Sequence, residues 1–395
     1  MKYKNALSIL PEELIEAIQQ YVQGEYIYIP IRDRVESTRM TEYDIELQKR
    51  DEHIYTKSLE GINNKKLAEM YCLSESSIRR IIIGQRQRYE GMRDRIDDII
   101  KNWSIEDCEI MQVYDTSWQI GDRYILKVYE SEKMLERNIK IVSILGDMNI
   151  PVGRVVFTKE NTAFVKDDEY YYILSEKLSG SNIISIRDTP WIGDKMGKII
   201  ADLHIAFKEC EKQDEFWNNS LLSEMNGWIR QSFNENGWKY IDEKLFEKTV
   251  HQLELLYRYL PVQLIHRDVH FGNFLFNDGK FSGYIDFDLS QRNIRIFDLC
   301  YFMLGLLSEE AKLDITSEKW FSILRDVFNG YNQKILLLEE EIKAVPYVMK
   351  SIELLFVAWF LGQNDIKCVE NAIKIFHFID ENTDKILWSI SRRRK

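Results

Sequence analysis

The sequence has few cysteines, and they are neither paired nor clustered. Its five cysteines are an odd number, lie far apart along the chain and include no C-x-x-C spacing. A disulfide framework or a cysteine-bound zinc site needs paired or closely spaced cysteines, so neither is indicated. We expect reduced thiols and therefore a cytoplasmic protein.

Long hydrophobic runs are also missing. The longest, around LCYFMLGLL and LLFVAWFLG, fall short of the roughly 20 apolar residues that cross a bilayer, so we expect no membrane association. The N-terminus, MKYKNALSILPEELIE, reaches acidic residues before any stretch long enough for a signal peptide. A net charge of −11 argues against a chain that coats nucleic acid or anionic membrane over its whole length.

The chain is long enough for more than one structural unit. It has 395 residues, 45% of them hydrophobic, and single cores usually stop growing below that size. Short helical patterns occupy residues 1–95, whereas strands rich in Val, Ile and Tyr begin near residue 105 and a long helical region follows. We therefore expect a separate N-terminal domain over residues 1–95.

The segment NKKLAEMYCLSESSIRRIII has the pattern of a helix-turn-helix. Apolar residues recur on one face of each predicted helix, Ala68 is small enough for the helices to cross closely, and Ser74 is a natural N-cap. Between Arg79 and Arg95 six arginines stand against two acidic residues, which suits contacts with phosphates. A small helical bundle with a solvated basic face is the alternative. The predicted contacts with duplex DNA are Arg79, Arg80, Arg86 and Arg88.

Residues 1–90 resemble the middle-operon-regulator type of phage DNA-binding protein. In that type a strand ending in YIP precedes the helix-turn-helix, as EYIYIP does here. The resemblance implies that this strand pairs with its mate in a homodimer.

Carboxylate, amide and imidazole side chains gather in two short apolar segments, HRDVHFGNFLF (266–276) and YIDFDLS (284–290). Asn273 follows Asp268 after five residues, and Asp286 comes thirteen residues later. Buried charges of this kind need a partner or a metal. Phosphoryl transfer uses such a set: one aspartate orients and deprotonates the acceptor hydroxyl, while an asparagine and a second aspartate hold magnesium. We predict Asp268 as the catalytic residue and Asn273 and Asp286 as Mg²⁺ ligands.

These segments resemble the aminoglycoside phosphotransferase and choline kinase branch of the protein-kinase-like fold, over residues 105–395. The resemblance implies an α+β, bilobal phosphotransferase with a nucleotide-binding N-lobe (96–178) and a catalytic and acceptor-binding C-lobe (179–395). The helix RDRIDDIIKNW would join it to the all-α helix-turn-helix domain. Phe271 replaces the more usual proline, which bears on the stiffness of the loop. The residues implied to support the catalytic loop are His266, His270, Asp288 and Asp298.

The resemblance also implies an ATP site in the N-lobe. Lys127, in the strand YILKVYE, would pair with the phosphates, and Glu136 is chosen over Glu132 as its partner from the following helix. The hairpin MQVYDTSWQIG lacks the G-x-G-x-x-G of protein kinases, and YYYILSEKLSG is expected to be the edge strand and hinge. The remaining nucleotide contacts implied are Thr116 and Ser117 at the hairpin tip, Ile125 over the adenine, Glu176 and Leu178 in the hinge, and Leu275 and Ile285 as the adenine floor.

Together these features predict a transferase: a kinase that uses ATP and Mg²⁺ to phosphorylate a hydroxyl of a small molecule, with a DNA-binding module attached. Two alternatives stay open, a transcription regulator whose kinase-like domain senses a ligand without turnover, and a protein kinase similar to spore-coat relatives. The acceptor is not specified by the sequence. The acidic run 339–341 suits a cationic acceptor, yet such runs are usually solvated faces.

Overall fold

The structure is a computed structural model of the chain, and it describes residues 42–59, 61–71, 73, 75–114, 116–183, 192–308, 315–363 and 365–391. Contacts divide the chain into Met1–Thr41 and Glu42–Lys395. The predicted strand EYIYIP lies outside the described residues, so its pairing in a homodimer stays a prediction. Some side chains within the helices, those of residues 42–49, 52, 69, 76 and 86–94, also lie outside them.

Among the described residues, three α-helices precede the first strand: α2 (Glu42–Leu59), α3 (Asn64–Tyr71) and α4 (Glu75–Ile99). Ile54, Leu67 and Ile78, one from each helix, are fully buried against one another and form a small core. Helix α4 crosses residue 95 without a break and runs on into the 3-10 helix η2 (Ile100–Trp103). The expected joining helix is therefore the C-terminal part of α4 rather than a separate element.

The N-lobe is built on an antiparallel sheet with the strand order β1-β2-β3-β6-β4, in which β5 also pairs with β6. Because β6 has neighbours on both sides, the expectation that it is an edge strand is wrong. The two strands that cover its far side have two and three residues, which is too short to show a period in the sequence. The strands are β1 (Ile110–Tyr114), β2 (Ser117–Ile120), β3 (Tyr124–Tyr129), β4 (Val155–Val156), β5 (Val165–Asp167) and β6 (Tyr170–Glu176).

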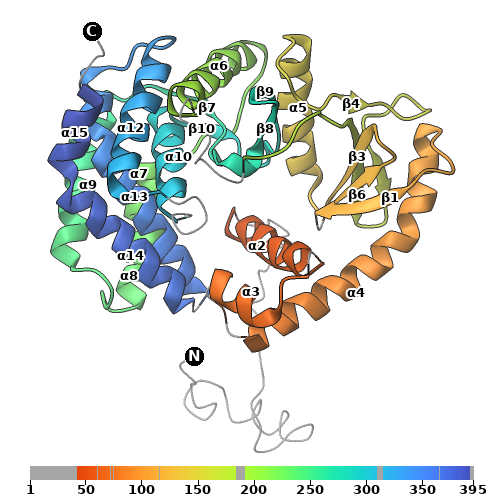
Figure 1. Ribbon diagram of the computed structural model, residues 1–395, viewed down its shortest axis with the longest axis horizontal. Helices are drawn as coiled ribbons and strands as arrows, with labels where there is room; N and C mark the ends of the chain where they lie inside the picture. The colour runs from red at the N-terminus through yellow and green to blue at the C-terminus, as the bar shows by residue number, and fades with distance from the viewer. Residues whose placement is uncertain are drawn as a thin grey trace, which may run out of the picture. The chain divides into compact units, whose positions relative to one another are not determined.

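Two helices cover opposite faces of this sheet, α4 on one side and α5 (Glu132–Asp147) on the other (Figure 1). Leu126 of β3 is buried in a cluster with Ile96 of α4, whereas Tyr129 is buried against Leu135 of α5. Successive side chains of a strand point to opposite faces. Lys127, the neighbour of Leu126, therefore lies on the α5 side of the sheet.

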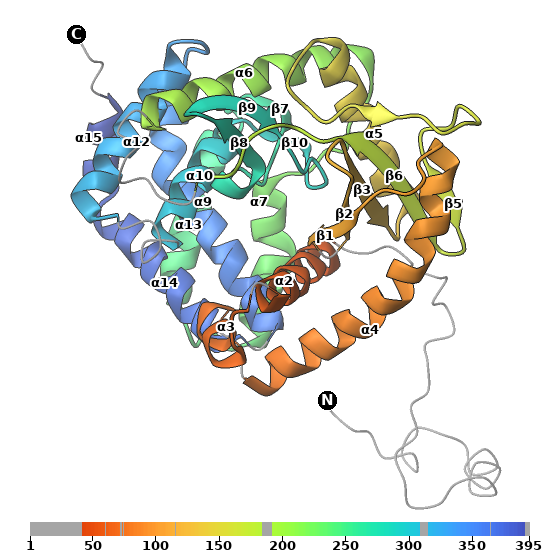
Figure 2. The ribbon, with the colours of Figure 1, turned by 45° about the vertical axis from the view of Figure 1, so that its right-hand side comes forward.

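The C-lobe is mainly helical, with two small two-stranded sheets, β7–β10 and β8–β9, among its helices (Figure 2). The turn of the β8–β9 hairpin contains Asp278 and Gly279 with φ of 48° and 72°, the left-handed geometry that Asp-Gly favours in tight hairpins. The elements are α6 (Ile192–Gln213), α7 (Leu221–Glu224), η3 (Met225–Ile229), α8 (Arg230–Glu235), α9 (Glu243–Tyr257), β7 (Val262–Ile265), η4 (Phe271–Asn273), β8 (Phe274–Asn277), β9 (Lys280–Tyr284), β10 (Gln291–Ile294), α10 (Ile296–Ser308), α12 (Ser317–Asn332), α13 (Glu339–Gly362), α14 (Ile366–Glu381) and α15 (Thr383–Ser391).

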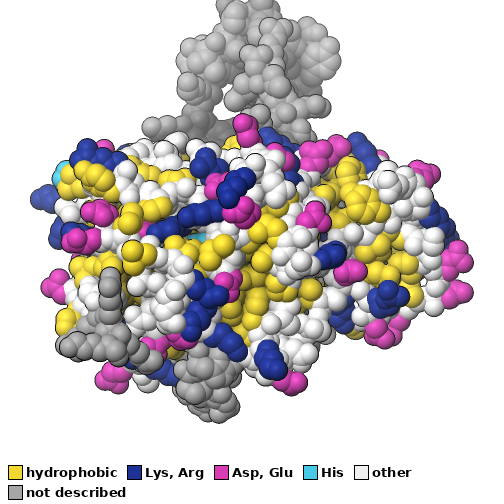
Figure 3. Space-filling view, turned by 90° about the horizontal axis from the view of Figure 1, so that it is seen from above, with side chains coloured by type: hydrophobic (Ala, Val, Ile, Leu, Met, Phe, Trp, Pro, Cys, Tyr) yellow, Lys and Arg dark blue, Asp and Glu magenta, His cyan; other side chains and the backbone are white. Residues whose placement is uncertain are grey.

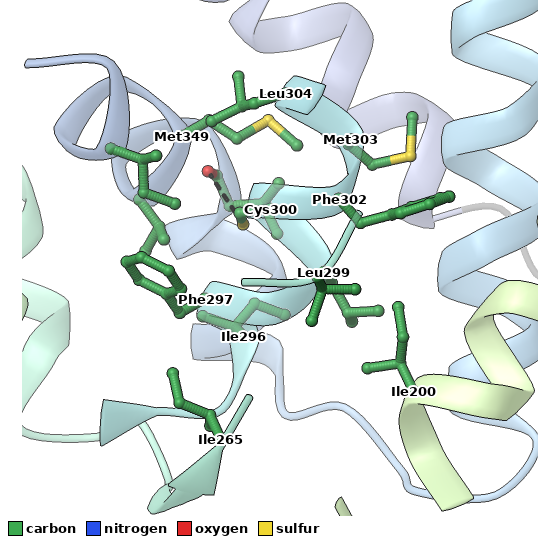
Figure 4. Packing of buried hydrophobic residues seen from close by; sticks show 14 of the residues in the cluster. Ile200, Ile265, Ile296, Phe297, Leu299, Cys300, Phe302, Met303, Leu304 and Met349 are labelled. Atoms are coloured by element: carbon green, nitrogen blue, oxygen red, sulfur yellow. Dashed lines mark hydrogen bonds between the residues drawn. The ribbon is translucent and has the colours of Figure 1, made fainter. Parts of the chain in front are cut away.

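Helix α10 lies in the centre of the largest hydrophobic core. Figure 4 shows its apolar side chains surrounded by those of neighbouring elements, with the Cys300 thiol directed at the Val345 carbonyl of α13, 3.8 Å away. Helix α13 is long and apolar enough to cross a membrane, but 83% of its most apolar window is buried inside the protein. It is therefore a core helix, and the packing around α10 fixes the position of Asp298 in its first turn.

Candidate active site

The Asp268 side chain, in the loop that follows β7, accepts hydrogen bonds from the same loop and from α10. It is nearly buried; Oδ1 accepts a hydrogen bond of 3.0 Å from the Tyr301 hydroxyl, and Oδ2 accepts one of 3.1 Å from Asn273 Nδ2. A carboxylate has two oxygens with two lone pairs each, so it can accept from several donors, a hydroxyl among them. Tyr301 was missed by the sequence analysis, because it lies on α10, 33 residues further along the chain.

The backbone of the same loop is anchored on Asp298. This fully buried carboxylate accepts hydrogen bonds from the backbone N–H of His266 (2.9 Å) and of Arg267 (2.8 Å) and from His204 Nε2 (2.9 Å). Arg267 has φ of +66°, a left-handed conformation that non-glycine residues rarely adopt. Its guanidinium pairs with the buried Glu224 carboxylate at 3.0 Å. The strained residue that precedes Asp268 is thus held at its backbone and its side chain.

The two histidines of the segment have different surroundings. His266 is fully buried, and burial lowers its pKa, so the ring is neutral and Nε2–H donates to the Ile285 carbonyl at 3.2 Å. His270 is 41% exposed, its Nδ1 accepts from the Gly272 N–H, and its Nε2 lies 3.6 Å from Asp268 Oδ1. His266 thus joins the loop to the segment before Asp286, while His270 lies beside the Asp268 carboxylate.

The loop is stiffened without the proline that the resemblance leads one to expect. The Phe271 ring is buried and meets the Phe302 ring edge-on, with centroids 5.3 Å apart. Asn182 Nδ2 donates to the carbonyls of Gly272 (2.7 Å) and Phe271 (3.1 Å). Asn182 also has no sequence signal, because it reaches the loop from about 90 residues away.

A second polar cluster lies on the α5 face of the N-lobe sheet. Lys127 Nζ is 2.6 Å from Asp288 Oδ2 and 3.3 Å from Asp286 Oδ1. Burial alone would lower the pKa of Lys127, but the two carboxylates raise it well above its ordinary value, so the amine is charged. The predicted pairing of Lys127 with Glu136 is wrong: Glu136 is exposed, and α5 instead directs Asn138 to the cluster, where Nδ2 donates to Asp288 Oδ1 at 2.8 Å.

Thr116 and Ser117, at the start of β2, belong to the hairpin expected to cover the phosphates. Ser117 lies opposite Lys127 in the β2–β3 register, which places the two residues side by side on neighbouring strands. Thr116 and Ser117 are both buried, and the Thr116 carbonyl accepts from the Val128 N–H at 2.8 Å. Their hydroxyls are therefore not at an open tip, contrary to the expectation, although Ser117 remains next to the lysine.

The segment expected to be the hinge follows β6. The Glu176 N–H donates to the Arg154 carbonyl and the Lys177 N–H to the Arg123 carbonyl, both at 2.8 Å. Of the two predicted hinge residues, Glu176 and Leu178, only Leu178 has a backbone N–H without a partner among the described residues. The predicted adenine contacts Ile125, Leu275 and Ile285 are all half-buried.

The side chains of Asn273 and Asp286 have the chemistry of a magnesium site. Asn273 Nδ2 donates to both the carbonyl and the carboxylate of Asp268, so the amide oxygen of Asn273 is the atom that can act as a ligand. Asp286 is 26% exposed and has φ of +64°, a second strained position. No cluster of three or more His, Cys, Asp or Glu occurs in the part of the chain that the structure describes. Magnesium on nucleotide phosphates needs only one or two protein oxygen ligands, so Asn273 and Asp286 fit that ion.

Two cavities lie away from these groups. One of about 600 Å³ is bounded by Glu75, Arg79, Arg80 and Ile83 on α4. Another, of about 290 Å³, lies among the end of α5, α6 and β9 and is lined by mainly apolar residues. The view from above in Figure 3 shows hydrophobic side chains gathered along the middle of one face. The exposed side chains of Arg79 and Arg80 are described, whereas those of Arg86 and Arg88 lie outside the described residues.

Comparisons with solved structures agree on the fold. The amicoumacin kinase hAmiN, solved with AMP-PNP, Ca²⁺ and Ami, is 16% identical, with a TM-score of 0.52 over 71% of this chain and 87% of that one. A microcompartment-associated aminopropanol kinase is 14% identical (TM-score 0.55; 74% and 97% of the chains), and choline kinase from Cryptosporidium parvum Iowa II is 15% identical (TM-score 0.53; 75% and 98%). At these identities the likeness establishes a kinase-like α+β fold and no more.

Two sequence comparisons differ in extent. A segment of 30 residues is 63% identical to the uncharacterized protein YraL of Bacillus subtilis (strain 168); it covers 8% of this chain and 34% of that protein, so the chain spans about a third of this relative. Residues 111–333, more than half of the chain, match the family described as "Phosphotransferase enzyme family". This match includes Lys127, Asp268, Asn273, Asp286 and Asp298, and the chain accordingly belongs to the phosphotransferase enzyme family.

Proposed function

We propose that the chain transfers the terminal phosphoryl group of ATP to a hydroxyl of a small molecule. The observation that carries this proposal is the presence of two polar clusters. In one, the Asp268 carboxylate accepts hydrogen bonds from Tyr301 and Asn273; in the other, the charged Lys127 lies beside Asp286. The family assignment supports a phosphotransferase of this kind. We keep the cytoplasm as the expected compartment.

Each residue has a distinct task in this proposal. Asp268 orients the acceptor hydroxyl and takes its proton, and Tyr301 keeps the carboxylate aimed during the transfer. Lys127 binds the α- and β-phosphates, and Asn273 with Asp286 would hold magnesium. When bound, ATP would supply the phosphoryl group and leave as ADP, and Mg²⁺ would neutralise the negative charge on the phosphates. The Leu178 N–H is the hinge donor for the adenine.

Two single substitutions test this division of tasks. Asp268→Asn keeps the shape of the side chain but removes the proton acceptor, so turnover should fall roughly a hundredfold or more while Mg·ATP still binds. Asp286→Asn should weaken Mg·ATP binding itself, with partial recovery at high magnesium. Binding is measured by calorimetry with Mg·ATP, and turnover as ATP consumption across a panel of amino alcohols, sugars, aminoglycosides and a protein substrate such as casein.

The contrast also separates the alternatives. If Asp268→Asn abolishes Mg·ATP binding and Asp286→Asn does not, the two aspartates have been assigned in reverse. Turnover of casein but of no small molecule would favour a protein kinase. If the wild-type chain binds Mg·ATP yet consumes none with any acceptor, a ligand sensor without turnover replaces the proposed enzyme.

We propose DNA binding as a second function, on a separate observation. Helices α3 and α4 are joined by the short segment 72–74, and α4 begins with the exposed side chains of Arg79 and Arg80 beside the cavity of about 600 Å³. Arginines on the first turns of the second helix are placed to contact phosphates or base edges in a major groove.

The test uses the full chain, because Ile96 and Ile99 of α4 are buried against the N-lobe and a fragment ending at residue 95 would lack that packing. Replacing Arg79 and Arg80 by Ala should weaken binding to duplex DNA by about tenfold or more and reduce its salt dependence. Replacing the distant Arg325 by Ala is the control. Absence of DNA binding by the wild-type chain at low salt would exclude this function.

A further inference from the structure

Lys127, the lysine proposed to contact the phosphates, is held by ion pairs that join the two lobes. Lys127 lies on β3 of the N-lobe, but both carboxylates that pair with it, Asp286 and Asp288, come from the segment between β9 and β10 of the C-lobe. The two carboxylates of α5 nearest in sequence point elsewhere: Glu136 is exposed, and Glu132 accepts a hydrogen bond from the Tyr171 hydroxyl. Among the described residues, α5 thus supplies no acidic partner for the lysine.

The two aspartates are not equivalent. Asp288 is 6% exposed and makes the shorter contact to the amine, whereas Asp286 is 26% exposed and makes the longer one. The second oxygen of Asp288 accepts two further hydrogen bonds, from the Tyr129 hydroxyl at 2.9 Å and from Asn138 Nδ2 at 2.8 Å. Asp288 therefore has a fixed orientation, and its contacts come from β3 and from α5.

We propose that Asp288 is the positioning residue for Lys127, and that Asn138 and Tyr129 set its orientation. This inference rests on the proposed function, because it takes Lys127 as the phosphate-binding lysine. Asn138 does what a carboxylate on α5 could not do: a second acid beside Asp288 would repel it, whereas an amide N–H donates to it. The lysine is consequently kept in place from the metal-binding segment rather than from the helix.

The charges explain why two carboxylates share one amine. Lys127 with Asp286 and Asp288 carries a net charge of −1, which favours a divalent cation at the outer carboxylate. If Asp286 were to bind magnesium, Lys127 would lose only its longer contact and would keep the 2.6 Å contact to Asp288. Asp288 would thus hold the lysine in place while Asp286 holds the metal.

The pairing can be tested without nucleotide. Acetic anhydride acetylates amines that are free of ion-pair contacts faster than amines held in them, so the modification of Lys127, followed by peptide mass spectrometry on the full chain, reports how firmly the amine is held by its carboxylate partners. Asp288→Asn should increase the rate at Lys127 by about fivefold or more relative to exposed lysines, and Asn138→Leu should increase it less, because it removes one donor to Asp288. Glu136→Gln should leave the rate unchanged.

A second measurement connects the pairing to binding. Asp288→Asn should raise the Kd for Mg·ATP by about tenfold and Asn138→Leu by about threefold, with Glu136→Gln as the matched variant on the same helix. If Asp288→Asn does not fold, Asn138→Leu and Tyr129→Phe each remove a single donor and give the same test. Equal acetylation of Lys127 in the wild type and these variants overturns the proposal, as does a loss of lysine protection in Glu136→Gln.

The acetylation and binding results keep two failures apart. Protection of Lys127 that depends on Asp288 supports the positioning role even if the chain binds no Mg·ATP, in which case the proposed function is what fails. Normal Mg·ATP binding by Asp288→Asn overturns the positioning role while leaving the proposed function intact.

Discussion

Asp298→Asn is expected to disturb the loop that carries Asp268, although Asp298 itself is fully buried. The carboxylate accepts three hydrogen bonds within a fully buried site, two from backbone N–H groups of the loop and one from His204. The amide keeps the volume but has one oxygen instead of two, so at least one buried N–H faces an NH₂ group and loses its acceptor. A buried donor left unpaired costs about 1–3 kcal/mol, and the bonds that remain lose their charge assistance.

We therefore expect the free energy of unfolding to fall by about 3 kcal/mol. Turnover should fall by about tenfold or more, because the strained Arg267 backbone beside Asp268 loses its anchor. Urea unfolding followed by tryptophan fluorescence gives the first quantity, and ATP consumption the second. The control is Asp98→Asn, whose carboxylate is 79% exposed in a pair with Lys101 and should change stability by less than about 0.5 kcal/mol. A variant within 1 kcal/mol of the wild type at full turnover would refute the anchoring role.

Two further predictions concern stability. Gly197→Ala should destabilise the C-lobe by about 2 kcal/mol or more in a thermal unfolding assay, because a Cβ on α6 would overlap sterically with the Val327 carbonyl oxygen of α12. Gly305→Ala on α10 adds a Cβ that meets no atom within 4 Å, and it should be neutral or slightly stabilising in the same assay. Burial raises the pKa of Glu353 well above its usual range, so the folded chain holds a proton there that the unfolded chain releases. The free energy of unfolding should therefore fall as the pH rises above the carboxyl pKa of the unfolded chain, by at most about 1.4 kcal/mol per pH unit. Glu353→Gln should remove this loss, and its advantage over the wild type in urea unfolding should grow between pH 5 and pH 7; parallel pH profiles would contradict the assignment.

The loop-and-hairpin arrangement of residues 266–290 could be predicted from the sequence because its spacing is local. A loop with Asp268 and Asn273, followed by a hairpin that returns to Asp286, needs no knowledge of distant contacts, and the β8–β9 hairpin has its turn where Asp278 and Gly279 suggest. The supporting contacts of Tyr301 and Asn182 are different. They arise from packing between segments far apart in the chain, which no periodicity encodes.

The choice of Glu136 as the partner of Lys127 overlooked a physical feature of helix α5 itself. In α5 the buried residues are Leu135, Ile141, Val142 and Leu145. Asn138 is three residues from both Leu135 and Ile141 and shares their face, whereas Glu136 is turned about 200° away from Asn138. Glu136 was chosen because an acidic residue was expected opposite the lysine. The helical phase of α5 instead predicts that Asn138 faces the cluster, as the structure shows.

Helix α4 links the orientation of the N-lobe sheet to the direction of Arg79 and Arg80. Its 25 residues make a rod about 37 Å long with Arg79 and Arg80 near one end and the buried Ile96 and Ile99 at the other. A rod without a joint passes on rotation instead of absorbing it, so any tilt of the N-lobe sheet reaches the two arginines as a change of direction. Inserting one residue in the middle would turn them by about 100°, whereas inserting seven would restore their direction to within about 20° and displace them by about 10 Å. The direction of these two arginine side chains relative to the N-lobe sheet is thus set by the number of helical residues between them and Ile96.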